Sequence, residues 1–261
     1  MSLPAAADRS GHARPVSQDD NEGIADPPPA YAGHDARRGK KGEARLPPAI
    51  AVIVAIALYA LLPQSLLVGP RLLIPTLEVV LLIVVVSSNP WRLNRQTRIT
   101  RIASLALAAL IVAANLVALG LLIHALVTAE TKQAGELLLA ALQVWATNVI
   151  AFGLIYWDLD RGGPVKRVQA EREDLPLADF RFSQDENRDT VVEVSNGSSE
   201  IGDWIPTFVD YLYVSTTNSS AFSPTDTMPL TSRAKILMAT QATAALLTSL
   251  LVIARAVGAL N

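Results

Sequence analysis

The chain has 261 residues, of which 51% are hydrophobic and 18% charged, and its mean hydropathy of +0.32 exceeds that of a typical soluble domain. The formal net charge of −2 argues against a nucleic-acid partner, and the absence of cysteine from the sequence excludes disulfides, thiolate catalysis and cysteine-ligated zinc. The apolar residues come in membrane-length runs, so we predict an all-α, polytopic helical bundle in the lipid bilayer.

The N-terminal stretch, residues 1–46, is rich in Pro, Gly, Ala and charged residues and has few side chains that could form a core. This composition predicts a disordered tail. The stretch lacks the apolar run of a signal peptide, so the first membrane span should act as the targeting signal. The basic residues at its end place the tail in the cytoplasm by the positive-inside rule. They are Arg37, Arg38, Lys40, Lys41 and Arg45.

Four apolar runs between residues 47 and 156 approach the length needed to cross a hydrocarbon core of about 30 Å as helices. Their predicted bounds are Pro48–Leu67, Arg71–Ser87, Ile102–Val127 and Leu137–Tyr156. The link between the second and third runs holds four arginines and no acidic residue, and basic residues return after the fourth run. This alternation predicts an up-and-down four-helix transmembrane bundle in a bacterial inner membrane, with its N-terminus in the cytoplasm.

An acidic connector, residues 157–203, follows the fourth run and holds twelve acidic and six basic residues. Asp158 and Asp160 stand near its start, but two carboxylates without a third ligand are weak support for a metal site, and we interpret them as a solvated helix end. The alternation in residues 190–200 favours a small hairpin. The run Ala234–Val257 then predicts a fifth transmembrane helix.

Residues 204–222, "WIPTFVDYLYVSTTNSSAF", lie between the connector and the last run. Their apolar part, about ten residues, is too short to cross a bilayer, whereas Trp and Tyr suit a membrane interface. We therefore predict a half-helix or re-entrant segment. Non-helical backbone at membrane depth needs protein or trapped water around it, so the hydroxyl run should face a polar cavity or pack inside the bundle.

A short pattern in this region resembles the pore module of potassium channels. Thr216 and Thr217 match its threonine step, and Asp226, Pro229 and Thr231 match a D-x-x-P-x-T motif before the final helix. The stretch after Thr217 has no glycine, on which a potassium filter depends, so the resemblance implies a channel-like protein without potassium selectivity. The pore-lining candidates are Thr216, Thr217, Asn218, Ser219, Ser220 and Asp226.

The sidedness of this segment leaves alternatives open. A channel pore loop enters from outside, but four preceding spans place the connector inside. Either the resemblance is superficial and the stretch is a polar turn, or the segment crosses as a short helix. The C-terminal two-thirds, including "YWDLDRGGPV" and "NSSAFSPTDTMPLTSRAK", is also similar to uncharacterised bacterial polytopic membrane proteins near the DUF1345 type. That resemblance supports the architecture and implies no activity.

Polar residues within the predicted spans are further candidates, because ionisable groups inside a membrane often mark pathways or paired sites. Glu78, near the centre of the second run, could pair with His124 on the third, or be protonated and only pack. Asn115 and Asn148 could line a cavity, although hydrogen bonding between helices is the simpler role.

Asp210 could cap the short segment or pair with Arg255, which could instead extend to the interface. The sequence shows no catalytic nucleophile motif, phosphate-binding loop or metal-ligand spacing, so we expect no enzyme, no catalytic residue, no metal and no cofactor. The leading hypothesis is a channel-like or transport-associated protein of unknown substrate that could form a homo-oligomer. The alternative is a membrane scaffold whose tail or connector binds an unidentified protein partner.

Overall fold

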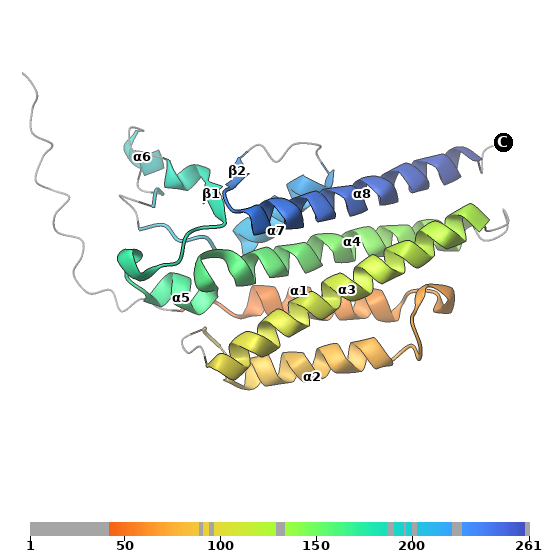
Figure 1. The fold of residues 1–261 in the computed structure, drawn as a ribbon, viewed down its shortest axis with the longest axis horizontal. Helices are drawn as coiled ribbons and strands as arrows, with labels where there is room; N and C mark the ends of the chain where they lie inside the picture. The colour runs from red at the N-terminus through yellow and green to blue at the C-terminus, as the bar shows by residue number, and fades with distance from the viewer. Residues whose placement is uncertain are drawn as a thin grey trace, which may run out of the picture. The chain divides into compact units, whose positions relative to one another are not determined.

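The structure, a computed structural model, is mostly helical (Figure 1). It describes residues 42–88, 91–93, 97–128, 134–186, 191–195, 197–199, 203–220 and 226–258. The predicted tail therefore lies outside the described residues as far as residue 41. Glu43 and Arg45, which the composition assigned to that tail, are described: Arg45 is 6% exposed, and the Glu43 carboxylate accepts a hydrogen bond from the Phe208 amide.

Three helices are long and apolar enough to cross a membrane, namely α3 (Arg98–Thr128), α4 (Ala134–Leu159) and α8 (Ser232–Gly258). They are rich in Ala and Leu, the residues with high helix propensity, and hold no proline. Two shorter apolar helices precede them, α1 (Leu46–Ala60) with 15 residues and α2 (Leu73–Ser88) with 16.

The turn between α1 and α2 explains why α1 is shorter than its apolar run. Pro63 cannot continue a helix, and a 3₁₀ turn, η2 (Gln64–Leu66), follows it. Gly69 has a φ of +76°, which a glycine adopts without strain. Arg71 closes the turn by donating a hydrogen bond to the Leu62 carbonyl at 3.2 Å.

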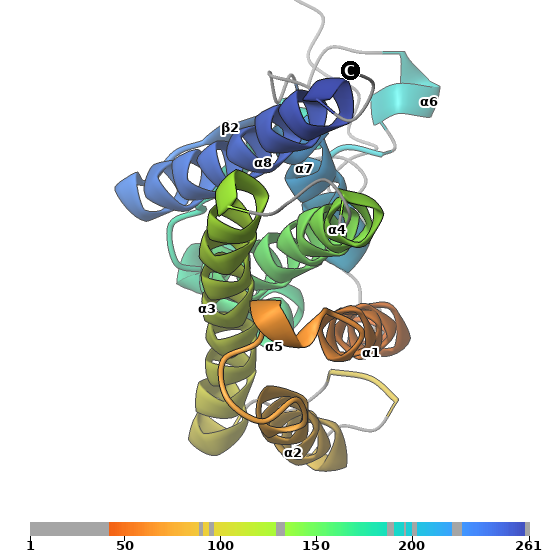
Figure 2. The same cartoon turned by 90° about the vertical axis from the view of Figure 1, so that its right-hand side faces the viewer.

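The central helix of the bundle is α4, which packs against α1, α3, α7 and α8, whereas α2 packs on α1 and α3 (Figure 2). The most apolar stretch of α4 is 61% buried, compared with 39% for the corresponding stretch of α3 and 28% for that of α8. Large apolar side chains lie exposed on the outer helices, among them Ile53, Val80, Ile83, Leu250 and Ile253. An apolar outer surface of this kind fits a lipid environment.

Successive long helices run in opposite directions, so their ends gather in two groups. One end holds the starts of α1, α3 and α8 and the ends of α2 and α4; we call it the charged end. Its members include Glu43, Arg101, Asp160, Arg167, Asp179 and Arg233. The other end, which we call the far end, holds the α1–α2 turn, which packs against α3.

Short elements complete the charged end: α5 (Pro164–Gln169), α6 (Val192–Ser195), and the 3₁₀ turns η4 (Asp160–Gly162), η5 (Arg172–Asp174) and η6 (Ser183–Asp185). Strand β1 (Phe180–Phe182) pairs antiparallel with β2 (Thr227–Pro229), with Arg181 opposite Met228. The hairpin predicted over residues 190–200 is wrong, because residues 192–195 form α6 and its two valines are exposed. The alternation that builds a strand lies in β1 instead, where two buried phenylalanines flank an exposed arginine.

The predicted short segment is a 13-residue helix, α7 (Phe208–Ser220). It begins at the charged end, where the Phe208 amide donates to Glu43, and its later residue Asn218 bonds the Met238 carbonyl, in the second turn of α8. It therefore runs in the same direction as α8 and ends part-way into the bundle. By β2 the chain is back at the charged end, paired with β1. The segment enters and leaves the bundle at one end (Figure 1).

Candidate functional site

The break between α4 and α5 brings two carboxylates into the protein. Arg161, Gly162 and Gly163 all have positive φ angles, and Pro164 starts α5 directly afterwards. The turn directs Asp158 and Asp160 inward, and they are only 2% and 0% exposed. The interpretation of these residues as a solvated helix end is therefore wrong, because protein groups replace water around both carboxylates.

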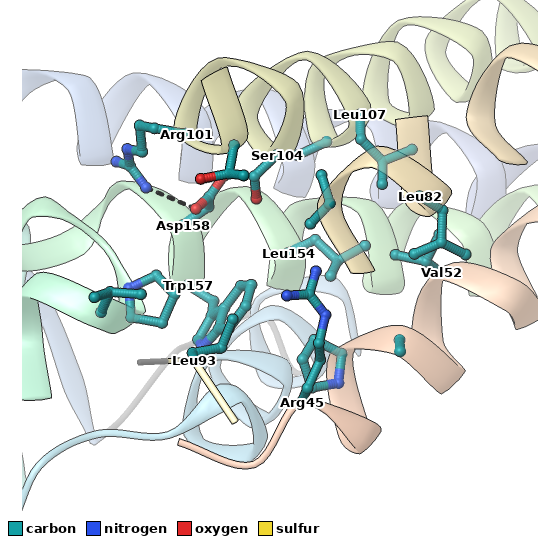
Figure 3. A pocket seen from close by; sticks show the side chains of 17 residues that line it. Arg45, Val52, Leu82, Leu93, Arg101, Ser104, Leu107, Leu154, Trp157 and Asp158 are labelled. Carbon is teal, nitrogen blue, oxygen red and sulfur yellow. Dashed lines mark hydrogen bonds and ion pairs between the residues drawn. The ribbon is translucent and has the colours of Figure 1, made fainter. Parts of the chain in front are cut away.

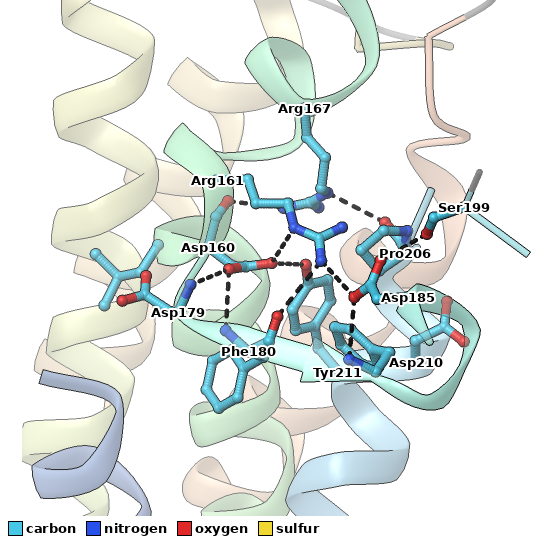
Figure 4. A network of polar contacts seen from close by, with 12 residues as sticks. Asp160, Arg161, Arg167, Asp179, Phe180, Asp185, Ser199, Pro206, Asp210 and Tyr211 are labelled. Carbon is cyan, nitrogen blue, oxygen red and sulfur yellow. Dashed lines mark hydrogen bonds and ion pairs between the residues drawn. The ribbon is translucent and has the colours of Figure 1, made fainter. Parts of the chain in front are cut away.

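Asp160 organises the network of Figure 4. One carboxylate oxygen accepts hydrogen bonds from the amides of Asp179 at 2.6 Å and Phe180 at 3.3 Å, and the other accepts one from the Tyr211 hydroxyl. The Arg161 guanidinium lies 3.6 Å from the same carboxylate. With this many donors, Asp160 joins α4, the connector and α7.

Arg167, on α5, is the buried cation of the network. It donates to the carbonyls of Pro206, Trp157 and Asp160 at 3.0–3.1 Å. Its guanidinium also lies 4.9 Å from the centre of the Tyr211 ring, a cation–π distance. Its Nη2 has no hydrogen-bond partner among the described residues and lies 3.6 Å from the Glu43 carboxylate. The bonds that the other two nitrogens make hold the neighbouring segments in place.

Glu43 completes the network from a position before α1. Its carboxylate accepts hydrogen bonds from the Trp157 indole at 3.0 Å and the Phe208 amide at 2.6 Å, and lies 3.6 Å from Arg167. Burial raises the pKa of Glu43 above its ordinary value, and the Arg167 charge and the donated hydrogen bonds oppose this only in part. Glu43 thereby joins the start of the helical bundle to α4, α5 and α7.

Three more ion pairs attach the connector and α3 to this end: Arg101–Asp158 at 2.7 Å, Arg161–Asp185 at 2.6 Å, and Arg233–Asp179. Asp179 also accepts a hydrogen bond from the Thr231 hydroxyl, so it holds the start of α8. In the part of the chain that the structure describes, no group of three or more His, Asp or Glu residues could hold a metal ion.

A second polar network lies in the middle of the bundle, around Gln241 of α8. Its side-chain nitrogen donates to Ser219 Oγ at 2.8 Å and to the carbonyl and hydroxyl of Ser215. Its side-chain oxygen accepts from the Tyr156 hydroxyl at 2.6 Å and from Asn218 at 2.9 Å. Gln241 and Tyr156 were not predicted as site residues, although a glutamine inside an apolar run is the same signal that identified Asn115 and Asn148.

The predicted Asn115 and Asn148 belong to this second network. Asn115 donates to Asn148, which donates to the backbone carbonyl of Gln241, both at 3.4 Å, which is long for a hydrogen bond. Both asparagines are buried. The structure thus brings α3, α4, α7 and α8 together through one set of polar side chains.

The predicted hydroxyl run is helical as far as the structure describes it. Thr216 and Ser220 donate to carbonyls four residues earlier, Leu212 and Thr216, at 2.7 and 2.6 Å. Thr217 bonds the carbonyls of Tyr213 and Val214 in the same way. These hydroxyls satisfy themselves on their own helix, whereas a channel filter would present backbone carbonyls. Residues 221–225 lie outside the described residues.

The acidic candidates occupy different surroundings. Asp226 accepts a hydrogen bond from the Tyr213 hydroxyl at 3.2 Å at the protein surface. Asp210 accepts from the amide and hydroxyl of Thr207 at 2.7 and 2.9 Å and thereby caps the start of α7. The Arg255 side chain lies outside the described residues.

Glu78 and His124 are not joined among the described residues by an ion pair or hydrogen bond. Glu78 is 1% exposed, and its Oε2 has no hydrogen-bond partner there. His124 is exposed near the end of α3. A buried carboxyl group without a partner at this oxygen is costly, so Glu78 remains a candidate site residue separate from His124.

Comparison with models of known protein families gives no match, and comparison with curated proteins and with solved structures gives none either.

Proposed function

We propose that the protein is an integral membrane protein with five crossing helices that takes part in transport as a homo-oligomer, with α7 as a re-entrant, pore-helix-like element. One observation carries this proposal: α7 and α8 begin at the same end of the bundle, and the chain has returned to that end between them. A short helix that enters a membrane protein and is followed by a return and a full-length helix is the plan of a pore module.

The apolar surface and the arginines support five spans. At about 1.5 Å per residue, α1 and α2 reach roughly 22 and 24 Å, and thinning of the bilayer accommodates helices shorter than the hydrocarbon core. Both expose large apolar side chains, such as Ile53 and Ile83. The concentration of arginines at the charged end supports a cytoplasmic location for that end.

A passage in this proposal runs between copies of the chain, because α7 packs against α4 and α8 inside one copy. The exposed face of α8 supports such an arrangement. Thr240 and Thr243, beside Gln241, are exposed at mid-helix, although threonine is an uncommon choice for a surface that faces only lipid. Polar side chains on a membrane helix more often meet another helix or water.

Native mass spectrometry of the detergent-purified protein, followed by ion flux into proteoliposomes, tests the proposal. We expect a ring-forming oligomer such as a tetramer, and flux that falls at least about tenfold when Thr240→Val and Thr243→Val are combined. Thr128→Val is the matched control, since Thr128 is also exposed and also bonds the carbonyl four residues earlier, but on α3. A stable monomer without flux would refute the transport role.

A membrane scaffold is the second candidate, and the Gln241 network favours it. Every polar group of Gln241 is bonded inside one copy of the chain, as expected of a network that only holds helices together. Glu78→Gln separates the two functions. A transporter should lose the pH dependence of its flux in this variant, whereas a scaffold should change only in stability.

A further inference from the structure

Glu43 lies in a short segment whose backbone is fixed to the link between α2 and α3. The Glu43 carbonyl accepts a hydrogen bond from the Leu93 amide at 3.1 Å, and the Arg45 amide donates one to the Trp91 carbonyl at 3.3 Å. These bonds hold the backbone of Glu43 without any contribution from α7. The side chain of Glu43 can therefore change its conformation while its backbone stays in place.

The Glu43 carboxylate attaches the start of α7 to this anchored segment. The first amides of a helix have no partner within the helix itself, and Glu43 Oε1 accepts the hydrogen of the Phe208 amide at 2.6 Å. The preceding amide, that of Thr207, is bonded instead by Asp210 of α7 at 2.7 Å. Asp210 thus caps α7 from within, whereas Glu43 ties the helix to a distant part of the chain.

Packing beside this attachment is incomplete. The Trp157 indole donates to both carboxylate oxygens of Glu43, at 3.1 and 3.0 Å. Trp157 and Leu93 also line a cavity between α1, α2, α3 and α4, which contains about 730 Å³ of space not filled by atoms, part of it open to the outside (Figure 3). A side chain that borders such a space loses fewer contacts when it moves than one in a close-packed core. The Trp157 ring therefore has room to move when its bond to Glu43 breaks.

The charged groups that face Glu43 come from α5 and α7. On α5, Arg167 attracts the carboxylate, but its Nη2 lies 3.6 Å away and makes no hydrogen bond among the described residues. On α7, Asp210 repels the carboxylate. The contact from α4 is the uncharged Trp157 indole. Ionised Glu43 is thus attracted by one cation, which makes its own hydrogen bonds elsewhere, and repelled by one anion.

These surroundings determine which form of Glu43 the closed structure favours. Burial raises the pKa of Glu43 above its ordinary value and Asp210 adds to the increase, while Arg167 and the bonds from Phe208 and Trp157 oppose it in part. A Glu43 side chain that has turned to water would have the ordinary pKa of about 4.3. The closed structure therefore binds this proton more tightly than the open one. By linkage, a rise in pH from the ordinary pKa to the raised one favours opening.

We propose that Glu43 is a pH-sensitive latch on α7. The latch is closed when Glu43 is protonated, and at higher pH the ionised carboxylate turns to water and releases the Phe208 amide. Arg167 still holds the Pro206 carbonyl at 3.1 Å, so the release is confined to the first turn of α7. The latch concerns how α7 is seated, and it stands whether or not α7 borders a transport passage.

Hydrogen exchange of the full-length protein in detergent, followed by mass spectrometry, tests the latch at the first turn of α7. The protection factor divides the intrinsic exchange rate by the observed rate, which removes the ordinary effect of pH on exchange. We expect this factor to fall severalfold in the wild type as the pH rises above about 4.3. It should stay constant in Glu43→Gln, because glutamine does not titrate. The matched control Glu173→Gln removes an exposed acid of η5 and should behave like the wild type.

A second variant keeps the test decisive if Glu43→Gln does not fold. Asp210→Asn removes the charge that repels Glu43 but keeps the cap of α7, because asparagine caps a helix start as well as aspartate does. Its protection factor should fall less with pH than that of the wild type. An equal fall in the wild type and in either variant would overturn the proposal. So would wild-type protection that stays constant or increases as the pH rises.

Discussion

Several charged side chains of this protein are removed from water, although charged groups in isolation are most stable when solvated. Asp160 and Arg167 are buried, the Glu43 side chain is only 8% exposed, and each is surrounded by donors or acceptors from distant segments. Removing one partner of such a set typically costs about 3–5 kcal/mol, because the other charge stays buried without compensation. These residues therefore fix the geometry of the charged end, although such a network is not a large net source of stability.

The variant Glu43→Gln tests the contribution of one buried carboxyl group to stability, through the pH dependence of the unfolding midpoint. Burial raises the pKa of Glu43 in the folded protein, so its contribution to stability is complete below its ordinary pKa and is lost as the pH rises through the folded pKa. Glutamine does not titrate. We expect the unfolding midpoint of the wild type to fall relative to that of the variant as the pH rises above the ordinary glutamate pKa of about 4.3. The opposite trend would mean that the Arg167 charge outweighs burial and lowers this pKa.

The apolar runs predicted the long helices well, because apolar length alone identifies a membrane helix. The run 102–127 corresponds to α3, and 234–257 corresponds to α8, within a few residues at each end. Apolar length alone did not predict where α1 ends, because the apolar run continues to Leu67 whereas the helix ends before Pro63. The three candidate spans are thus readable from the sequence, and a count of five depends on how α1 and α2 sit in a bilayer.

The sites were less predictable, because their partners lie far apart in sequence. Asn115 and Asn148 were identified as polar residues in apolar runs, and they do join a shared network. Nothing local indicates that Asp160 meets Tyr211, 51 positions later, or that β1 pairs with β2. Spacing reveals helices, but the burial of a carboxylate follows from contacts that only the folded chain makes.

The α4–α5 turn is the element on which the charged end depends, and Gly163 tests it. Its φ of +94° is strained for other residues, and a Cβ there would lie 2.3 Å from Arg101 Nη1. Gly163→Ala should therefore break the Arg101–Asp158 pair and lower the free energy of unfolding by about 2 kcal/mol or more.

The matched control for that variant is Gly120→Ala in α3, where a Cβ would meet nothing within 4 Å. Alanine favours the helix by up to about 1 kcal/mol, so this substitution should be neutral or slightly stabilising. The stabilities of the two variants are compared by thermal unfolding in the same detergent. Equal stability of the two variants would show that the turn tolerates a side chain and that the pair does not need Gly163.

At the scale of the whole molecule, the described helices form an inside-out arrangement, with apolar side chains outside and polar networks within. The Gln241 network lies at mid-bundle, and ion pairs cover the charged end. The far end holds the apolar α1–α2 turn, with Arg71 bonded to a carbonyl within it. This asymmetry predicts a single orientation in the membrane.

The cysteine-free sequence allows a direct test of that orientation. Single cysteines can be placed at Leu177, which is 87% exposed at the charged end, and at Val68, 54% exposed in the α1–α2 turn. A membrane-impermeant maleimide should label Val68→Cys in intact cells, and Leu177→Cys only after the membrane is permeabilised. The unmodified protein, which stays unlabelled, is the control. The reverse pattern would invert the orientation, and labelling of both in intact cells would contradict the five-helix topology.

The hydrogen bond from Phe208 to Glu43 spans 165 positions of the chain and has a consequence for biosynthesis. At ordinary rates of translation, the ribosome needs on the order of ten seconds to make the intervening residues. During that time the Glu43 carboxylate has no Phe208 amide to bond, and the nascent helices must wait in the membrane with their charged end open to water. The charged end therefore closes as a late step of assembly, after α7 has emerged.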